Sequence, residues 1–184
     1  MDTYLLLLRG INVGGKNKVP MAALRGVLED LGYERVQSYI ASGNVIVDSP
    51  MPAAEVRAEV ETLLPQAFEL DSDLIKVLVL APDRLADVVA NRPAGFGEAP
   101  EKFHSDALFL IDVDADEVMP VFRPREGVDA VWPGKGVVYS QRLSAERTKS
   151  RLSLVMTSPH YKSMTIRSWT TTLKLLELLD ARKP

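Results

Sequence analysis

The sequence predicts an α+β protein in which two halves repeat the element order βαββαβ, each half with an antiparallel sheet. Short apolar runs of strand length alternate along the chain with amphipathic helical patterns, and two pairs of β-rich runs are joined by tight turn sequences. With 184 residues, 46% of them hydrophobic, the chain can bury a core in each half. We expect a first half over residues 1–81, a connecting helix and linker over 82–104, and a second half with a C-terminal helix over 105–184.

The first half begins with the apolar run Tyr4 to Arg9, which has the length of a buried strand. After a glycine-rich loop, Pro20 is placed to open a helix, because proline lacks an N–H that the first helical position leaves unused. Gly32 suits the left-handed cap that ends this helix. The half is completed by a hairpin of strands 36–41 and 44–48, a helix over 53–68 and a strand over 75–80.

A similar order of elements begins again after a short helix over 82–90 and a stretch rich in proline and glycine over 91–100. We expect Ser168 to cap a terminal helix and Trp169 to lie in the core. The βαββαβ order is that of the ferredoxin-like fold, so we expect a tandem duplication of two ferredoxin-like halves. The second half comprises a strand over 107–111, a helix over 114–121, a hairpin of strands 128–132 and 137–140, a helix over 149–156, a strand over 164–167 and the terminal helix over 169–179.

The amino-acid composition limits the kinds of catalysis and metal site that are possible and favours one cellular compartment. Cysteine is absent, which excludes disulfides, thiolate catalysis and Cys-ligated metal sites and favours the reducing cytoplasm. The first apolar run is too short for a signal peptide or a transmembrane helix, so we expect no membrane association. The net charge is −3, yet residues 142–168 carry six Lys or Arg against one Glu and sum to +5, which leaves −8 for the rest of the chain.

The glycine-rich loop contains part of a P-loop pattern. Gly10-x4-Gly15-Lys16 follows a predicted strand, but Asn17 stands where Ser or Thr would bind Mg²⁺. Pro20 also places the helix start four residues beyond Lys16, whereas a P-loop lysine lies at the opening of its helix. Hydrolysis of nucleoside triphosphates at this loop is therefore disfavoured.

The same loop suits a simpler role in binding anions. Gly14 and Gly15 permit a concave backbone, and Arg9, Lys16 and Lys18 supply positive charge. The alternative is that the glycines only turn the chain and that the basic side chains are solvated.

Neutral polar residues and a second basic segment extend this candidate site. If the loop lies near the hairpin turn, Asn12, Ser42 and Asn44 would orient a small polar ligand, although Gly-Asn is also ordinary hairpin chemistry. Arg151 and Arg167 would add charge if the C-terminal basic segment converges with the loop.

Metal and nucleic-acid sites are not favoured by the sequence. The two histidines, His104 and His160, lie in unrelated contexts without metal-ligand spacing. The acidic run Asp112 to Glu117 lacks the glycine of a calcium loop, and Asp114 with Glu117 instead predicts a helix capping box. The predicted central strands carry no aromatic residue on which RNA bases would stack, so RNA binding on the sheet face is disfavoured.

Several motifs resemble those of a known family. They are Leu8-Arg9-Gly10-Ile11-Asn12-Val13-Gly14-Gly15-Lys16-Asn17-Lys18-Val19-Pro20, Tyr39-Ile40-Ala41-Ser42-Gly43-Asn44-Val45, Ser150-Arg151-Leu152 and Thr165-Ile166-Arg167-Ser168-Trp169-Thr170-Thr171. Together they resemble the mostly bacterial domain of unknown function numbered 1697, whose last two motifs are Ser-Lys-Leu and Thr-x-Arg-Asn-Trp-Asn-Thr. This chain has Arg151 where the family has Lys, and Ser168 and Thr170 where it has Asn. The resemblance implies the paired ferredoxin-like fold and supplies no established activity.

We therefore expect the protein to bind a small anionic ligand, carrying phosphate or carboxylate, at the basic glycine-rich loop, without a metal ion or a cofactor. The sequence shows no activated nucleophile, and it leaves open whether a reaction follows binding. Two alternatives stay open. One is a non-catalytic interaction module or homodimer; the other is weak nucleic-acid binding through loops, with nucleic acid the less favoured partner.

Overall fold

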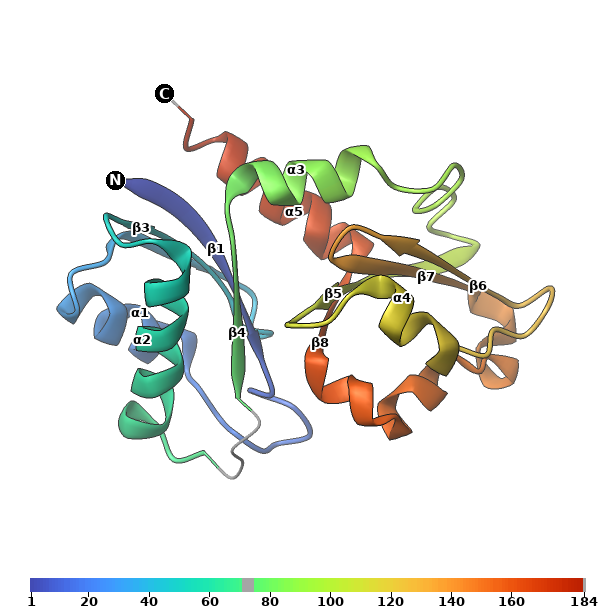
Figure 1. The fold of residues 1–184 in the computed structure, drawn as a ribbon, viewed down its shortest axis with the longest axis horizontal. Helices are drawn as coiled ribbons and strands as arrows, with labels where there is room; N and C mark the ends of the chain where they lie inside the picture. Colours follow the sequence, from blue (N-terminus) through green and yellow to red (C-terminus); the bar gives the residue numbers. More distant parts are fainter. Residues whose placement is uncertain (71–74, 184) are drawn as a thin grey trace. The chain divides into compact units, whose positions relative to one another are not determined.

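The structure, a computed structural model, describes residues 1–70 and 75–183, and the chain divides into two compact units. Unit 1 comprises residues 1–85 and 175–184, and unit 2 comprises residues 86–174. Each unit has its own four-stranded sheet (Figure 1). The boundaries fall inside two helices, α3 (Pro82–Ala90) and α5 (Trp169–Asp180), so both helices contribute residues to both units.

Unit 1 has two helices packed on one face of an antiparallel sheet. The strand order is β2-β3-β1-β4, with every neighbouring pair antiparallel. The predicted hairpin and the strands and helices around it are confirmed. The elements are β1 (Asp2–Arg9), α1 (Met21–Asp30), β2 (Glu34–Tyr39), β3 (Asn44–Ser49), α2 (Ala53–Ala67) and β4 (Lys76–Leu80).

The core of unit 1 forms because β1 is apolar on both faces. Leu6 and Leu8 pack with Leu24 and Leu28 of α1 in the core between sheet and helices, while Leu5, which points to the other face, is also fully buried. A strand buried on both faces is a continuous apolar run, as the sequence has it.

The end of α1 is a Schellman motif, as its glycine predicts. Gly32 has φ of +92° and donates its N–H to the Glu29 carbonyl at 2.9 Å, and Tyr33 donates to the Leu28 carbonyl at 3.1 Å. The helix itself begins at Met21, one residue after Pro20, which is the N-cap. Local chemistry therefore sets both ends of this helix.

Unit 2 contains a second antiparallel sheet with the order β6-β7-β5-β8. Counted along the chain, its strands lie in the same second-third-first-fourth order as those of unit 1. Leu108, Val118, Val138 and Met164 belong to its core. The elements are β5 (Phe103–Leu110), α4 (Ala115–Val118), β6 (Asp129–Gly134), β7 (Val137–Leu143) and β8 (Met164–Ser168), and the two units together confirm the α+β class.

The prediction of a helix over residues 149–156 is wrong. The chain forms three short 3₁₀ segments instead, over Ser144–Lys149, Leu152–Thr157 and Pro159–Ser163. Hydroxyl side chains take up backbone donors here: the Leu152 N–H donates to Ser150 Oγ at 3.3 Å and the His160 N–H donates to Ser158 Oγ at 3.1 Å. Such local bonds compete with a continuous helix.

The predicted capping box at 114–117 does not form. Asp114 occupies the N-cap of α4, but within the described residues its side chain accepts no capping hydrogen bond. The Glu117 carboxylate lies 3.8 Å from His160 Nδ1 instead of bonding back to the N-cap. The helix continues only as a 3₁₀ turn over Met119–Val121, where Pro120 has no N–H to donate.

The start of α5 confirms two predictions. Ser168 Oγ accepts a hydrogen bond from the Thr171 N–H at 3.2 Å, which is N-cap geometry. Trp169 is 6% exposed and its ring meets that of Phe96 edge to face at 5.0 Å, and Phe96 meets Tyr139 in the same manner at 5.1 Å. Trp169 is therefore a core residue of unit 2.

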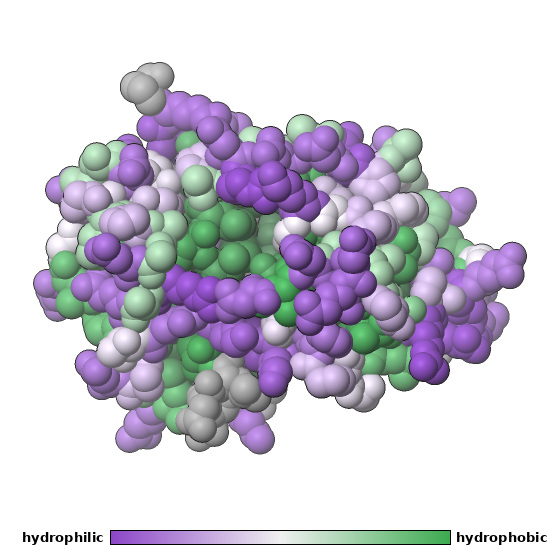
Figure 2. Space-filling model, in the orientation of Figure 1, coloured by the Kyte–Doolittle hydropathy of each residue, from purple (hydrophilic) through white to green (hydrophobic). Residues whose placement is uncertain are grey.

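Helix α3 is amphipathic, with Leu85 and Val88 buried. Figure 2 shows mainly hydrophilic residues on the side of α3 that faces the viewer. Across residues 1–70 and 75–183, no helix combines the length and the apolar character needed to cross a membrane.

Candidate functional site

The glycine-rich loop of unit 1 is a small hairpin. Lys16 donates its N–H to the Val13 carbonyl at 3.0 Å, and Gly14 and Gly15 between them have φ of +58° and +79°. Positive φ at both central residues is the mark of the type I′ turn, which favours glycine. Apart from the chain neighbours of each glycine, no described atom lies within 4 Å of a Cβ added at Gly14 or Gly15, so a side chain at either position would enter open space.

Asn12 ties this hairpin to the rest of unit 1. Its Oδ1 accepts a hydrogen bond from the Val19 N–H at 2.8 Å, and its Nδ2 donates to the Val19 carbonyl at 3.0 Å and to the Ala41 carbonyl at 2.8 Å. Asn17, which is 8% exposed, donates Nδ2 to the Gly10 carbonyl at 2.8 Å. The loop is thus held as a rigid frame, and it meets the turn between β2 and β3.

The turn between β2 and β3 is equally fixed. Asn44 is fully buried and donates Nδ2 to the Tyr39 carbonyl at 3.0 Å and to Ser42 Oγ at 2.9 Å. Gly43 has φ of +80°, and a Cβ there would lie 2.9 Å from Leu8 Cβ. The neutral residues predicted to orient a ligand are therefore brought together, and the bonds described here fasten the two loops to each other.

Asn12→Ala is expected to lower the free energy of unfolding by about 2 kcal/mol. The change removes three hydrogen bonds and leaves three backbone groups of Val19 and Ala41 without their partner, at a net cost of about 0.5–1 kcal/mol for each group. Urea unfolding followed by circular dichroism measures it. Asn91→Ala, which removes a bond from an exposed side chain in unit 2, is the control; equal losses in the two variants would contradict a framing role for Asn12.

Basic side chains gather where β1 ends and β4 begins. Arg9 lies directly opposite Lys76 in the antiparallel pairing of these strands. Both alternate with core residues, so both point to the face away from α1 and α2. Lys16 and Lys18 are exposed on the loop that follows β1, and no ion pair within the described residues involves Lys16, Lys18 or Lys76.

The two C-terminal arginines predicted for the site lie in unit 2 and differ in exposure. Arg151 is exposed, and its backbone N–H donates to Asp129 Oδ2 at 2.8 Å. Burial raises the pKa of Asp129, but this hydrogen bond and others outweigh it, so the pKa lies below its ordinary value. Because Arg151 contacts Asp129 through its backbone N–H, this contact does not depend on whether the side chain is arginine or the lysine of the family motif.

Arg167 is buried, with 6% of its surface exposed. Its guanidinium donates to Thr165 Oγ1 at 2.9 Å and to the Ile166 carbonyl at 2.8 Å. Burial lowers the pKa of Arg167 to about 10. A role for Arg151 and Arg167 at the glycine-rich loop stays a prediction, because those arginines and the loop belong to different units.

Sequence reasoning missed a charged group on the sheet of unit 2. His104 Nε2 lies 3.1 Å from Asp106 Oδ2, and Arg142 lies opposite His104 in the pairing of β5 with β7. Burial raises the pKa of Asp106, and the nearby charges of His104 and Arg142 oppose that rise only in part. The signal was present: residues two apart on a strand share a face.

His104 also lines a pocket of about 300 Å³ together with Ser105, Ser168 and Thr170. An imidazole oriented by a carboxylate can transfer protons, so this group has the elements of an acid–base pair. The described residues hold no cluster of three or more His, Asp or Glu side chains able to bind a metal ion.

Comparison with known proteins identifies the family of the chain but no activity for it. The chain is similar to the conserved bacterial protein SP0830 from Streptococcus pneumoniae, with 28% sequence identity, a TM-score of 0.79 and coverage of 98% of this chain and 99% of that one. No curated protein matches the chain. The profile of a family described as "Protein of unknown function (DUF1697)" matches residues 1–139, the range that contains the glycine-rich loop and the turn between β2 and β3. The resemblance noted in the sequence is thus confirmed, and the chain belongs to the DUF1697 family.

Proposed function

We propose that the basic end of unit 1 binds a small ligand that carries a phosphate or carboxylate group. The observation that carries the proposal is the cross-strand pair of Arg9 and Lys76. Like charges directly opposite each other on neighbouring strands destabilise a sheet. A bound anion would be attracted by both positive charges, and Lys16 and Lys18 add exposed positive charge from the adjacent loop.

The loop supports binding through its rigidity. The bonds of Asn12 and Asn17 hold the hairpin in one shape before any ligand arrives, which lowers the entropic cost of binding. The open space around Gly14 and Gly15 leaves their backbone accessible to a ligand. Charge stabilisation by Arg and Lys is the chemistry that this arrangement supports.

The fold proposal is a tandem duplication of ferredoxin-like halves over residues 1–81 and 105–184, joined by the helix and linker at 82–104. The shared second-third-first-fourth strand order of the two antiparallel sheets supports it. The elements of the second half also follow the order of the first, except that three short 3₁₀ segments replace the second helix.

Lys76→Glu tests the proposed anion site. Thermal unfolding of the wild-type protein is expected to shift upward with inorganic phosphate or citrate, relative to chloride at equal ionic strength. A ligand at about a hundred times its dissociation constant stabilises by about 2.7 kcal/mol. Lys76→Glu places a carboxylate opposite Arg9, so we expect the variant to gain up to about 1 kcal/mol without ligand and to lose the shift with phosphate.

Lys135→Glu, in the turn between β6 and β7 of unit 2, is the matched control and should keep the phosphate shift. Equal stabilisation of wild type and Lys76→Glu by phosphate would contradict the proposal. A change of mass on a sizing column in Lys76→Glu would favour an interface instead, and binding of nucleic acid that weakens steeply with salt would favour that partner.

A further inference from the structure

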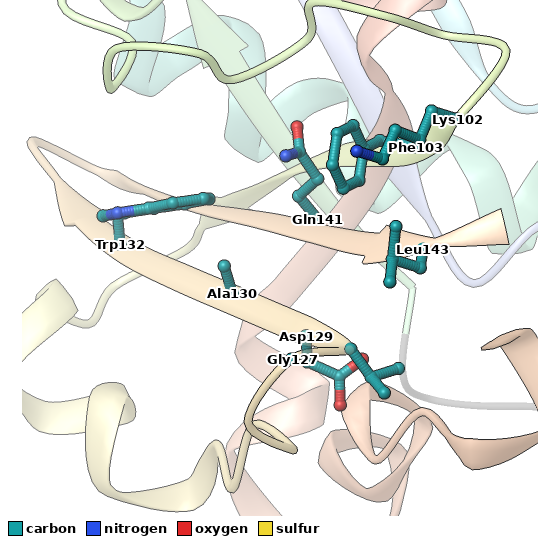
Figure 3. Close-up of a pocket in the computed structure, with 9 residues that line it drawn as sticks. Lys102, Phe103, Gly127, Asp129, Ala130, Trp132, Gln141 and Leu143 are labelled. Carbon is teal, nitrogen blue, oxygen red and sulfur yellow. The ribbon is translucent and has the colours of Figure 1, made fainter.

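A groove of about 440 Å³ lies along one face of the sheet in unit 2 (Figure 3). Its wall is mainly apolar, formed by β6, the adjacent part of β7 and the start of β5. Such apolar clefts with a few placed polar groups are the usual form of small-molecule sites. The side chains that matter for its chemistry are those of Lys102, Phe103, Trp132 and Gln141.

The Gln141 side chain supplies a donor of fixed orientation. Gln141 is 9% exposed, and its Oε1 accepts hydrogen bonds from the Gly97 N–H at 3.1 Å and from Ser105 Oγ at 2.8 Å. Because both donors hold the oxygen, the amide cannot turn over. The hydrogen bonds of the described chain leave Nε2 without an acceptor, and Figure 3 shows this nitrogen on the side facing Trp132.

Trp132 forms an aromatic wall whose position is also fixed. Its ring meets the ring of Phe96 edge to face, with centroids 6.0 Å apart, and Phe96 is fully buried. Across the groove, Lys102 Nζ lies 5.1 Å from the centroid of the Phe103 ring. The groove therefore presents a π surface, the amide donor of Gln141 and the exposed cation of Lys102.

We propose that this groove binds a planar heteroaromatic ligand that has an in-plane acceptor and an anionic substituent. The ring stacks on Trp132, a ring carbonyl or ring nitrogen accepts from Gln141 Nε2, and the anion reaches Lys102. Asp129 also lines the groove: its Oδ2 accepts from the backbone N–H groups of Arg125 and Arg151, and its Oδ1 is buried without a hydrogen-bond partner among the described residues. This site lies wholly in unit 2 and does not depend on the anion site of unit 1.

A small molecule fits the groove better than an extended peptide. β6 is an edge strand, and a peptide would have to pair with its free backbone edge. Pro133 lies within β6 and has no N–H to donate, which interrupts such pairing. A peptide is therefore the competing outcome of the test.

Gln141→Glu is the decisive variant, because glutamate keeps an oxygen for Gly97 and Ser105 but replaces the Nε2 donor with an acceptor. The probes are orotate, a planar pyrimidine carboxylate, together with uncharged uracil and non-planar cyclohexanecarboxylate, measured by calorimetry and by quenching of tryptophan fluorescence. We expect orotate to bind, cyclohexanecarboxylate not to bind, and Gln141→Glu to weaken orotate at least tenfold. Gln66→Glu, exposed on α2, should bind orotate like the wild type.

Lys102→Met tests the contribution of the cation separately from that of the Gln141 amide. It also keeps the proposal testable if Gln141→Glu does not fold. Lys102 is exposed, so its replacement should weaken orotate about tenfold and leave uracil unchanged. The proposal is overturned if orotate binds both variants as it binds the wild type, if no planar probe binds the wild type at millimolar concentration, or if only an extended peptide occupies the groove.

Discussion

Gly97→Ala is expected to lower the free energy of unfolding by about 4 kcal/mol. Gly97 has φ of +75°, and an added Cβ would lie 2.2 Å from Trp169 Cδ1 and 2.3 Å from Trp169 Nε1. The indole cannot yield easily, because Trp169 packs edge to face on the buried ring of Phe96. The left-handed backbone costs about 1–2 kcal/mol for a residue with a Cβ, and overpacking costs about 1–3 kcal/mol more.

Gly95→Ala is the matched control for this experiment. Gly95 has nearly the same φ, +78°, but the described residues leave the space around its Cβ position empty within 4 Å. It should lose only the backbone cost, about 1–2 kcal/mol. Urea unfolding of both variants measures the difference, and equal losses would mean that Trp169 moves aside without penalty.

Gly97→Ala should also weaken any ligand held in the groove of unit 2. The Gly97 N–H is one of the two donors that orient the Gln141 amide. A shift of this backbone would free the amide to turn, although no groove residue itself is replaced. Stability and binding are thus expected to fall together in this variant.

Asp48→Asn is expected to destabilise the protein by about 3 kcal/mol at neutral pH. Asp48 is 3% exposed, accepts a hydrogen bond from Thr3 Oγ1 at 2.8 Å and pairs closely with Arg35. Arg182, whose side chain is 10% exposed, lies 3.5 Å away. Removing one partner of a buried pair costs about 3–5 kcal/mol because a charge is left uncompensated; we take the lower end because the Arg35 side chain is 55% exposed.

The same carboxylate gives a pH dependence of known sign. Burial raises the pKa of Asp48, but hydrogen bonds from Thr3 and Arg35 and the charges of Arg35 and Arg182 lower it below the ordinary value of 3.8. The stabilisation is therefore complete above about pH 4 and is lost as the pH falls through the pKa of the folded state. Asp48→Asn should lack this component of acid unfolding.

Urea unfolding at neutral pH and an acid titration followed by circular dichroism measure the two effects. Asp30→Asn, at an exposed position of α1, is the control and should change stability by no more than about 0.5 kcal/mol. If Asp48→Asn unfolds at the same urea concentration as Asp30→Asn, the contacts of Asp48 with Arg35 and Arg182 do not stabilise unit 1.

Arg35 shows why this network is specific to the fold. It has φ of +47°, and the pairing of β2 with β3 shifts register between Glu34 and Gln37. A bulge of this kind redirects a side chain, and here Arg35 reaches Asp48 on the neighbouring strand. Arg182, near the C-terminus, donates to the Arg35 carbonyl at 2.6 Å and so holds the end of the chain on unit 1.

Most elements of the fold followed from local chemistry. The helix predicted over 82–90 has those bounds, and both predicted hairpins form. The predictions failed where polar side chains had several possible partners. The segment 149–156 became 3₁₀ turns through serine hydroxyls, and Glu117 turned toward His160 instead of the N-cap. A sequence pattern shows which groups can form hydrogen bonds, but it does not show which of several possible partners each group binds in the fold.

The candidate sites were predictable only in part. The basic loop residues Lys16 and Lys18 are exposed, as a binding role requires, but Lys76 enters the site only through its pairing with Arg9. The role of Gln141 could not be predicted from the sequence, because a single glutamine in a strand forms no recognisable pattern until its hydrogen-bond partners are known. The pair of His104 and Asp106 was readable from strand alternation alone.

Local residue order was enough to specify the strands, the ends of α1, the N-cap of α5 and the family motifs, because strand pattern, capping and turn preference act between residues close in the chain. Only the tertiary structure brings Asn12 within hydrogen-bond distance of Ala41, 29 positions away. In the same way it brings the Gly97 N–H to the Gln141 side chain, 44 positions away, and so orients the amide. Hydrogen bonds of that separation exist only after the sheets have formed, since the fold alone brings their donors and acceptors within reach.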